Sequence, residues 1–382
     1  MMSKSISLLL GAGFSAPMGY PVGKDLNDKL LGLNGTEFKF GVNESGSYYM
    51  TKRMSGVNCR EHARDEAFKY CVEQIHEYKQ RKQFDYEEFY DWLVTEAWED
   101  ERHFSVHVPE VYISLVLYFL KDKNKDQYYR NSSLDSSQSS SYDGILDFIL
   151  SSIESGNIVN VHTLNHDLLF EQFNKQGPLT GKISDGFERE NSPYYSNPHH
   201  DIKSLRQLRR YTGNYNQACR LYKLHGSIDQ FWYNKSPERG SQSNHCVKLD
   251  DFDDIRFVGE MVPDENGVSN YQGHPGQFHP DSLTGTTSKE LRYQEPFYTE
   301  LFDQFKKNRQ QAEKLIIIGY GGKDEEVNKI IREHFDHKNK PSYIIDPYAG
   351  DAVRKLAREI GATILPPEKT VETVTAEDLY KR

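Results

Sequence analysis

The sequence predicts an α/β fold, a doubly wound, Rossmann-like, mostly parallel sheet with a helical insertion. Three observations predict it. The N-terminal stretch SISLLLGAGFSA passes from apolar residues straight into glycines. Later apolar stretches also end in polar or glycine-rich turns, as in NIVNVHTLNHD and KLIIIGYGG. The C-terminal third alternates short apolar runs with amphipathic segments, which is typical of parallel sheets that bind a ligand at their strand carboxyl ends.

The composition is compatible with a large core and an acidic surface. The chain has 382 residues, enough for two or three domains or for one elaborated α/β domain. Its hydrophobic fraction is 36% and its aromatic fraction 13%, with a mean hydropathy of -0.77, so general disorder is disfavoured. The net charge of -10 gives no field that attracts a phosphate backbone, so we expect no direct nucleic-acid binding.

The cysteines and the apolar stretches bear on metal content and location. Cys59, Cys71, Cys219 and Cys246 form no C-x-x-C pair, so we expect no zinc and instead thiols in a reducing cytosol. The N-terminal apolar run is too short for a signal peptide, and the longest apolar stretch, residues 111–120, is too short to span a bilayer. We therefore expect a cytoplasmic protein without membrane contact.

The first expected elements are a strand over residues 6–10, a glycine turn, and a loop and helix within residues 15–31. The spacing of Gly11, Gly13 and Ala16 fits G-x-G-x-x-A. In that pattern the glycines allow a tight turn and let backbone N–H groups approach a pyrophosphate, and the small third residue lets helix and strand pack closely. A turn with a purely structural role is the alternative. No Walker lysine follows, which disfavours ATP hydrolysis here.

Residues 36–144 are predicted to form a mainly helical insertion. The Gly-, Ser- and Asn-rich residues 32–58 indicate a mobile loop. Helices are expected over residues 61–82, 84–98 and 111–120, where apolar positions recur at helical spacing or run together. The serine-rich residues 121–144 indicate a flexible surface loop because they offer little apolar surface to bury.

The remaining chain alternates strands and helices around two polar stretches. Strands are expected over residues 157–164, 221–224, 314–318 and 342–345, and helices over residues 145–153, 168–175, 296–311, 323–335 and 351–360. The clustered Arg206, Arg209 and Arg210 are interpreted as a solvated helix face. Residues 234–292 are interpreted as a loop-like insertion.

Five of these predicted strands end in unusual residues. They are the turn at Gly11, Asn165-His166-Asp167, His225-Gly226-Ser227, Gly319 to Gly322 with Asp324, and Asp346. Because the carboxyl ends of parallel strands meet at one edge of a sheet, these residues are expected to line a single crevice.

Four motifs, GAGFSAPMGYP, TLNHD, KLHGS and GYGGKDEEVN, together resemble those of sirtuin-like NAD-consuming domains, and most of all their bacterial antiphage branch. They occur in the right order across most of the chain, whereas residues 32–157 and 234–292 carry no recognisable part. The resemblance implies a sirtuin-like NAD-binding domain made of residues 1–35 and 145–382. A variable insertion spans about residues 234–292, and residues 36–144 form the helical insertion with its loop at 121–144.

The resemblance also implies residue roles. Asn165 orients the nicotinamide ribose and a water, Asp167 holds the carboxamide, and His225 is the general base. Gly11, Ala12, Gly13 and Ser15 hold the NAD phosphates and the adjoining ribose. The further expected NAD-binding residues are Gly226, Ser227, Gly319, Gly321, Asp324, Asn328 and Asp346, with Asp324 and Asn328 on the adenosine side. NAD is a substrate here, and no metal is expected.

These residue types suit cleavage of an N-glycosidic bond. Such cleavage creates an oxocarbenium-like ribose, so it needs a positioned water or hydroxyl and a base that works near neutral pH. The alternatives are structural. His225 is then a core histidine, Asn165 and Asp167 are helix N-caps, and the run from Gly319 to Gly322 is a tight turn.

Three departures separate the chain from sirtuin deacylases. Val22-Gly23-Lys24 stand where the deacylases have Asp-Phe-Arg, Leu164 replaces the Gln before the catalytic Asn, and both C-x-x-C pairs of the zinc ribbon are missing. The Phe that covers the reactive ribose carbon is thus absent, which favours water as the acceptor.

The sequence therefore favours an NAD+ glycohydrolase that releases nicotinamide and ADP-ribose and depletes NAD as an antiphage defence effector. The resemblance implies a homo-oligomer docked on a HerA-type hexameric ATPase, with residues 59–120 as a candidate contact surface or an ordinary helical layer over the sheet. The alternatives are an NAD-dependent deacylase or ADP-ribosyltransferase, and a non-enzymatic NAD or ADP-ribose sensor that controls a partner ATPase or nuclease.

Overall fold

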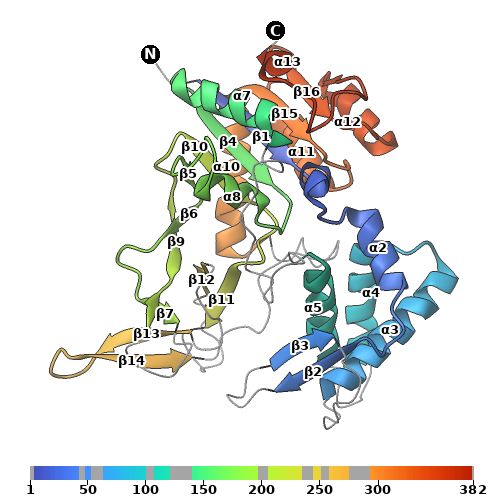
Figure 1. Cartoon of the computed structure of the whole chain (residues 1–382), viewed down its shortest axis with the longest axis vertical. Coiled ribbons are helices and arrows are strands. Elements are labelled where there is room, and N and C mark those ends of the chain that lie inside the picture. The colour runs from blue at the N-terminus through green and yellow to red at the C-terminus, as the bar shows by residue number, and fades with distance from the viewer. Residues whose placement is uncertain are drawn as a thin grey trace.

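A computed structural model of the chain describes residues 4–42, 48–52, 63–99, 107–120, 140–196, 205–234, 244–250, 258–274 and 293–380. The large sheet consists of β1 (Ser5–Leu10), β4 (Ile158–Thr163), β5 (Ile183–Ser184), β10 (Cys219–Lys223), β15 (Ala312–Ile318), β16 (Ser342–Ile345) and β17 (Thr363–Ile364). Its order is β17-β16-β15-β1-β4-β10-β5, and every neighbouring pair is parallel (Figure 1). The predicted Rossmann-like α/β fold is confirmed.

Helices cover both faces of this sheet. On one face, Leu8 and Leu10 of β1 share a core with α7 (Asp143–Glu154), α8 (Leu169–Lys175) and α13 (Ala376–Tyr380). On the other face, Leu9 shares a core with α10 (Pro296–Gln311), α11 (Glu325–His334) and α12 (Asp351–Ile360). Strands buried on both faces need apolar residues at successive positions, which explains the uninterrupted LLL of β1 and III of β15.

The strand order reverses direction beside β1. The chain adds β4 and β10 on one side of β1 and then β15, β16 and β17 on the other. The reversal leaves a topological switch point between β1 and β15. In open α/β sheets, ligands bind outside the carboxyl ends of the strands at such a point.

The strand ends line up in one row of the sheet. Cα partners run from Ile345 of β16 to Ile318 of β15, Leu10 of β1, Thr163 of β4 and Lys223 of β10. The residues that follow this row therefore emerge at one edge. The predicted convergence of the five strand ends is confirmed.

A separate helical group lies to one side of the sheet (Figure 1). It consists of α2 (Gly23–Leu31), α3 (Ala63–Arg81), α4 (Tyr86–Glu99) and α5 (Val108–Leu120), which share one core. The expectation of a loop over residues 32–58 holds for residues 33–37 and is wrong for residues 38–42 and 48–52. There, β2 (Phe38–Val42) and β3 (Tyr48–Lys52) form an antiparallel hairpin, because Phe38 packs its ring 5.7 Å from that of Phe68 on α3.

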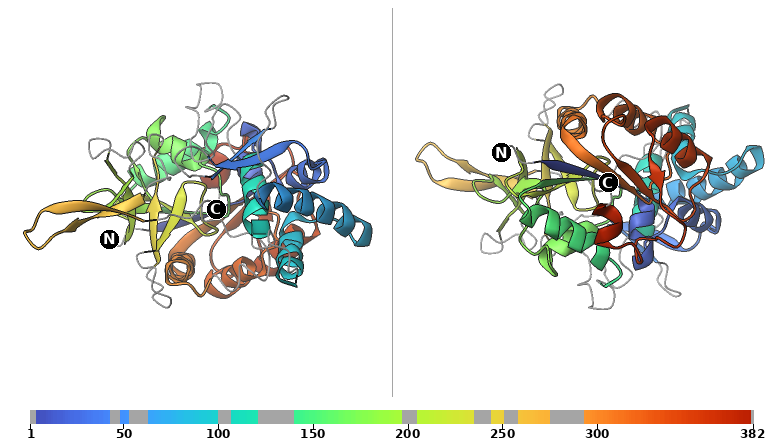
Figure 2. Two further views of the ribbon diagram at one scale, coloured as in Figure 1. Left: turned by 90° about the horizontal axis from the view of Figure 1, so that it is seen from below. Right: turned by 90° about the horizontal axis from the view of Figure 1, so that it is seen from above.

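Two small antiparallel sheets follow the central strands. One consists of β11 (Gln230–Asn234), β12 (Asn244–Lys248), β9 (Arg209–Asn214) and β6 (Gly186–Glu188). The other consists of β14 (Ser269–His274), β13 (Val258–Pro263), β7 (Tyr194–Ser196) and β8 (Arg206–Gln207). Figure 2 places the β13–β14 hairpin and helices α3 and α4 at opposite ends of the molecule.

These sheets correct two further expectations. The arginines at 206, 209 and 210 lie on strands, not on a solvated helix face, and residues 234–292 contain strands as well as loop. The strands form because partners distant in the sequence supply their hydrogen bonds, as in the pairing of Val247 with Arg210. Such partners leave no period in a single stretch of sequence. Most of the expected 121–144 loop lies outside the described residues.

The described ranges also bear on membranes and metals. No helix in them is long and apolar enough to cross a membrane. No group of three or more His, Cys, Asp or Glu side chains in them is placed to hold a metal ion. Cys71, Cys219 and Cys246 are buried, and Cys59 lies outside the described residues.

Candidate nucleotide site at the carboxyl edge of the sheet

Three glycines let two loops touch at the switch point. A Cβ on Gly11 would lie 2.6 Å from the Gly319 carbonyl oxygen, and one on Gly13 would lie 2.7 Å from the Gly319 Cα. Gly319 itself has a φ of +59°, and its own Cβ would lie 2.4 Å from the Gly13 carbonyl carbon. Any side chain at these positions would force the loops apart. The glycine spacing read from the sequence thus serves a backbone-to-backbone contact.

That contact occupies amides that the sequence pattern assigns to a pyrophosphate. Gly11 N–H donates to the Ile318 carbonyl at 2.9 Å, and Gly13 N–H donates to the Gly319 carbonyl at 3.0 Å. Ala12 between them is exposed, as is Gly321 in the facing loop. A Cβ on Gly321 would meet nothing within 4 Å. The solvent-exposed backbone at this switch point is therefore that of Ala12 and Gly321 rather than that of Gly11 and Gly13.

Asn165 lies in the turn after β4 and is held by its amide nitrogen. Its Nδ2 donates to the Gly11 carbonyl at 2.9 Å and to Ser15 Oγ at 3.1 Å. Its backbone N–H donates to Thr163 Oγ1 at 3.0 Å. No described residue donates to Oδ1, so the amide oxygen is left as the acceptor that a ligand hydroxyl or water can use. Ser15 thereby fixes which way Asn165 points.

Asp167 follows in the same turn and is also braced. Its Oδ1 accepts the Leu169 N–H at 3.0 Å, as a residue at the start of a helix does. Burial raises the pKa of the Asp167 carboxyl, although Lys223 and a hydrogen bond from Ser15 act in the opposite direction. Ser15 therefore connects Asn165 with Asp167. The N-cap alternative for Asp167 is wrong, because Leu168 is the N-cap of α8, and the Asp167 carboxyl instead braces the turn before that helix.

His225 emerges from β10, next to the end of β4, and is 5% exposed. Its Nε2 lies 3.1 Å from Asp324 Oδ2 and 3.3 Å from the Tyr293 hydroxyl. Its ring centroid is 6.4 Å from that of His166 in the β4 turn. The structure thus brings His225 together with Asn165 and Asp167 through adjacent strand ends, and it adds Tyr293, which sequence reasoning missed.

The residues after His225 shape this turn. Gly226 has a φ of +79°, which a residue with a side chain rarely adopts. Ser227 Oγ donates to the His166 carbonyl at 3.4 Å, and the Ile228 N–H donates to the same oxygen at 3.0 Å. Ser227 is fully buried. The HGS sequence therefore ties the β10 turn to the β4 turn.

The loop after β15 holds Asp324 and Asn328. Asp324 Oδ1 accepts the Val327 N–H at 3.1 Å and so caps α11. Asn328 is buried; its Nδ2 donates to the Gly322 carbonyl at 2.9 Å and its Oδ1 accepts from Tyr320 at 3.0 Å. Asn328 thus braces the glycine loop, and both polar atoms of its side chain have partners within the protein.

Asp346 lies at the end of β16, farther along the same edge. Its Oδ1 accepts the Tyr348 N–H at 2.9 Å, and partial burial raises the pKa of its carboxyl. Tyr348 is 89% exposed. Asp346 therefore shares the edge with Gly319 and Gly11, but no hydrogen bond among the described residues joins it to His225.

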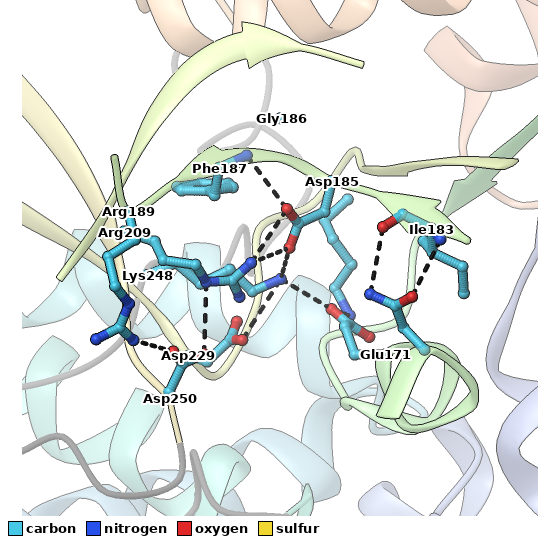
Figure 3. Close-up of polar contacts among 12 residues, drawn as sticks. Glu171, Ile183, Asp185, Gly186, Phe187, Arg189, Arg209, Asp229, Lys248 and Asp250 are labelled. Carbon is cyan, nitrogen blue, oxygen red and sulfur yellow. Dashed lines mark hydrogen bonds and ion pairs between the residues drawn. The ribbon is translucent and has the colours of Figure 1, made fainter. Parts of the chain in front are cut away.

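A buried charged cluster lies behind the β4 turn and was missed from the sequence. Its centre is Lys248, which is 0% exposed and whose Nζ lies 2.8 Å from Asp185, 3.2 Å from Glu171 and 3.5 Å from Asp229 (Figure 3). Lys223 lies 3.5 Å from Glu171 and donates to the Asp167 backbone carbonyl. The cluster therefore supports the turn that carries Asn165 and Asp167.

Burial and ion pairing shift the pKa values of the cluster residues in opposite directions. Burial disfavours ionisation of Asp185, but Lys248 and Arg209 outweigh it and lower its pKa. Burial likewise disfavours the charge on Lys248, but the three carboxylates raise its pKa. Asp229 differs, because burial raises its pKa and its buried Oδ1 has no hydrogen-bond partner among the described residues. The sequence feature that indicates such a cluster is a charged residue inside an otherwise apolar strand, such as Lys223 in CRLYK.

A family model described as a SIR2-like domain matches residues 159–365, more than half of the chain. The chain therefore belongs to the SIR2-like family. No curated protein matches it. The match includes the turns that carry Asn165, His225 and Asp324, whereas β1 and its glycine turn lie before it. The fold and the site together define an NAD-related SIR2-like domain on a Rossmann-like sheet.

Among solved structures, the chain is similar to several Sir2 proteins. One comes from work on the mechanism and regulation of Sir2 enzymes, with 10% identity, 99% of this chain and 92% of that chain covered, and a TM-score of 0.36. Another, from work on sirtuin substrate affinity, has 12% identity, coverage of 99% and 94%, and a TM-score of 0.35. A Sir2 with a p53 peptide and NAD+ has 12% identity, coverage of 98% and 91%, and a TM-score of 0.31. Scores this low assign no residue roles.

Proposed function

We propose that the chain is an NAD+ glycohydrolase that releases nicotinamide and ADP-ribose. The observation that carries the proposal is the alignment of Asn165 and His225 at adjacent strand ends, next to a glycine-built switch point. A dinucleotide has the length to extend along this edge, from the β4 and β10 turns past Gly11 and Gly319.

The side chains suit that substrate chemically. Asn165 offers its Oδ1 because Ser15 and Gly11 engage its Nδ2. The Asp167 carboxyl, held in its turn by the Leu169 N–H, is the proposed partner of the nicotinamide carboxamide. Exposed Gly321 leaves room for a phosphate at the switch point. These features support a site for NAD as substrate.

The residues have separable tasks in the reaction. Asn165 accepts a hydrogen bond from the attacking water or from the ribose and so positions it. His225 takes the proton that water loses as positive charge develops on the ribose carbon. Asp167 holds the leaving nicotinamide. The nicotinamide leaves with the electron pair of the glycosidic bond, and no covalent partner from the protein is needed.

Water is the proposed acceptor. Leu164 occupies the position before Asn165 where the deacylases have Gln, and it packs against the core formed with α10 and α11. Val22 to Lys24 stand where the deacylases carry the Phe that covers the ribose carbon, and here they begin α2. The lack of that Phe supports hydrolysis over transfer to an acyl-lysine.

The test of the activity is NAD+ consumption with product analysis by chromatography, for the wild type and for Asn165→Ala and His225→Ala. We expect nicotinamide and ADP-ribose from the wild type and a loss of at least about 100-fold in either variant, the size of a general-base contribution. If NAD+ binds but is never consumed, the site is that of a sensor.

We also propose that the activity serves antiphage defence by depleting NAD, as a homo-oligomer that docks on a HerA-type hexameric ATPase. The four quoted motifs support this assignment by their resemblance to that branch. The helical group of α3, α4 and α5 is the proposed contact surface. Light scattering of the chain alone, and together with a HerA-type ATPase, tests the assembly. A monomer that does not bind such an ATPase would contradict it.

A further inference from the structure

His225 belongs to a three-residue group in which each member contacts both others. His225 Nε2 lies 3.1 Å from Asp324 Oδ2 and 3.3 Å from the Tyr293 hydroxyl. The Tyr293 hydroxyl lies 3.4 Å from the same Asp324 oxygen. The three residues come from three different parts of the chain: the β10 turn, the segment before α10, and the loop after β15.

Asp324 is held so that only one carboxyl oxygen is directed at His225. Its Oδ1 caps α11 through Val327 N–H. Its backbone N–H donates to the Tyr320 hydroxyl at 3.2 Å, and that hydroxyl is itself held by Asn328. Because the backbone and Oδ1 are both fixed, Oδ2 has little freedom to leave the imidazole.

Tyr293 serves as a neutral donor in this group. Burial, followed by the charge of Asp324, raises the pKa of its phenol well above the ordinary value. Its ring packs 4.3 Å from that of Phe302 on α10, which sets the position of the hydroxyl. Tyr293 therefore orients its partners by hydrogen bonding and carries no charge at neutral pH.

We propose that Asp324 is a positioning residue for His225. It accepts from Nε2–H, fixes the plane and tautomer of the imidazole, and stabilises the imidazolium that forms when His225 takes a proton. This inference rests on the proposed NAD+ hydrolysis and departs from the adenosine-side role that the sequence resemblance implies for Asp324. A carboxylate that accepts from one imidazole nitrogen makes the other nitrogen the basic one.

The other ionisable groups near His225 are few among the described residues. His166 of the β4 turn has its ring centroid 6.4 Å away. Glu87 of α4 and Glu326 of α11 act on Tyr293 through their charges. Asp324 is the carboxylate in direct contact, so its removal should dominate any change in how His225 titrates.

The experiment compares the wild type with Asp324→Asn and Asp324→Ser. Asn and Ser are both good helix N-caps, so both variants keep the cap on α11. Neither offers an anionic acceptor to Nε2–H. Imidazole nitrogens are followed by NMR on ¹⁵N-histidine-labelled protein, with His225→Gln to assign the signal. In parallel, kcat and KM for NAD+ are measured across pH, and thermal melting checks the fold.

We expect the wild type to hold the Nε2–H tautomer and both variants to lose it, with the His225 titration moving to lower pH. The acid limb of the pH–rate profile should move in the same direction, because the base is then less easily protonated. We expect kcat to fall about 10- to 100-fold, the loss of one hydrogen bond to a charged group, with KM nearly unchanged. Asp324→Glu should recover part of kcat.

Tyr293→Phe is the matched variant that keeps the ring and removes the hydroxyl. We expect it to lower kcat only about twofold to tenfold, the loss of one neutral hydrogen bond, with the His225 tautomer retained. An equal or larger effect than that of Asp324→Asn would assign the positioning role to Tyr293 and overturn the proposal.

A rise in KM with kcat and the His225 titration unchanged would also overturn it and return Asp324 to the adenosine side. The NMR measurement needs no turnover. If the wild type consumes no NAD+, the proposed hydrolysis fails, while the tautomer and titration still decide whether Asp324 positions His225.

Discussion

Lys248 and Arg309 are both fully buried, but their pKa values are shifted in opposite directions. Lys248 lies within 3.5 Å of three carboxylates, and they raise its pKa. Arg309 on α10 contacts Ser7 Oγ at 2.6 Å, the Leu8 carbonyl at 3.4 Å and the Phe305 ring. No carboxylate in the described part of the chain pairs with Arg309, and burial lowers the pKa of its guanidinium to about 9. Burial alone does not decide the state of a charge; its partners do.

The two buried cations also differ in their position relative to the candidate site. The Lys248 cluster reaches the candidate site, because its Glu171 and Lys223 support the Asn165–Asp167 turn. Arg309 instead lies against the middle of β1 and near His162, whose pKa burial lowers. Ion pairs therefore support the turn of the candidate site, whereas hydrogen bonds to Ser7 and the Leu8 carbonyl hold Arg309 against the sheet. Three variants test this contrast.

The largest expected effect is that of Lys248→Met. It leaves Glu171, Asp185 and Asp229 buried without their shared cation, and removing one partner of a buried ion pair costs about 3–5 kcal/mol. The measurement is the free energy of unfolding in guanidinium chloride. The double variant Lys248→Met with Asp185→Asn should recover part of the loss. Equal stability of wild type and Lys248→Met would show that the cluster contributes no net stability.

The next effect is the pH dependence carried by Asp185. Its pKa is lowered in the folded chain, so its contribution is present above the unfolded value of about 4 and is lost as pH falls towards the folded value. Asp185→Asn should therefore cost about 2–3 kcal/mol at pH 7 and about 1 kcal/mol less at pH 3, which lies about one pH unit below the unfolded value. The readout is the difference in unfolding free energy at the two pH values. A difference that does not shrink would contradict the pairing.

The smallest effect is expected for Arg309→Met, within about 1 kcal/mol in either direction. Replacing a buried charge by an apolar side chain of similar volume is often neutral or stabilising. Its unfolding free energy is compared with that of Lys248→Met, the same replacement at the other cation. A loss as large as the Lys248→Met loss would mean that the hydrogen bonds to Ser7 and Leu8 carry as much stability as the ion cluster.

Much of the site's location could be predicted from the sequence. Gly11, Asn165, His225 and Gly319 each follow a strongly apolar stretch, and the parallel topology brings such strand ends to one edge. The antiparallel strands β6, β9, β12 and β13 could not be predicted, because their short polar sequences alternate weakly and gain stability from partners far along the chain.

The partners of individual side chains were harder to predict than their location. Arg209 was expected to be solvated, but it pairs with Asp185 at 3.1 Å because β6 and β9 are neighbours. The Asp324–His225 contact joins residues 99 positions apart by sequence number and depends on a loop whose motif indicated a nucleotide role. Lys248 carried no motif at all. Long-range contacts of this kind are fixed only by the folded chain.

The central claim is that water attacks the ribose carbon of NAD+ at the Asn165–His225 edge. The most direct measurement is turnover in H₂¹⁸O with mass analysis of the ADP-ribose formed, beside Asn165→Ala. We expect the wild type to incorporate one ¹⁸O atom into ADP-ribose during turnover. ADP-ribose that is only incubated with the enzyme for the same short time should stay unlabelled, and the variant should form no product. Transfer of ADP-ribose to a protein or acyl group without ¹⁸O would contradict it.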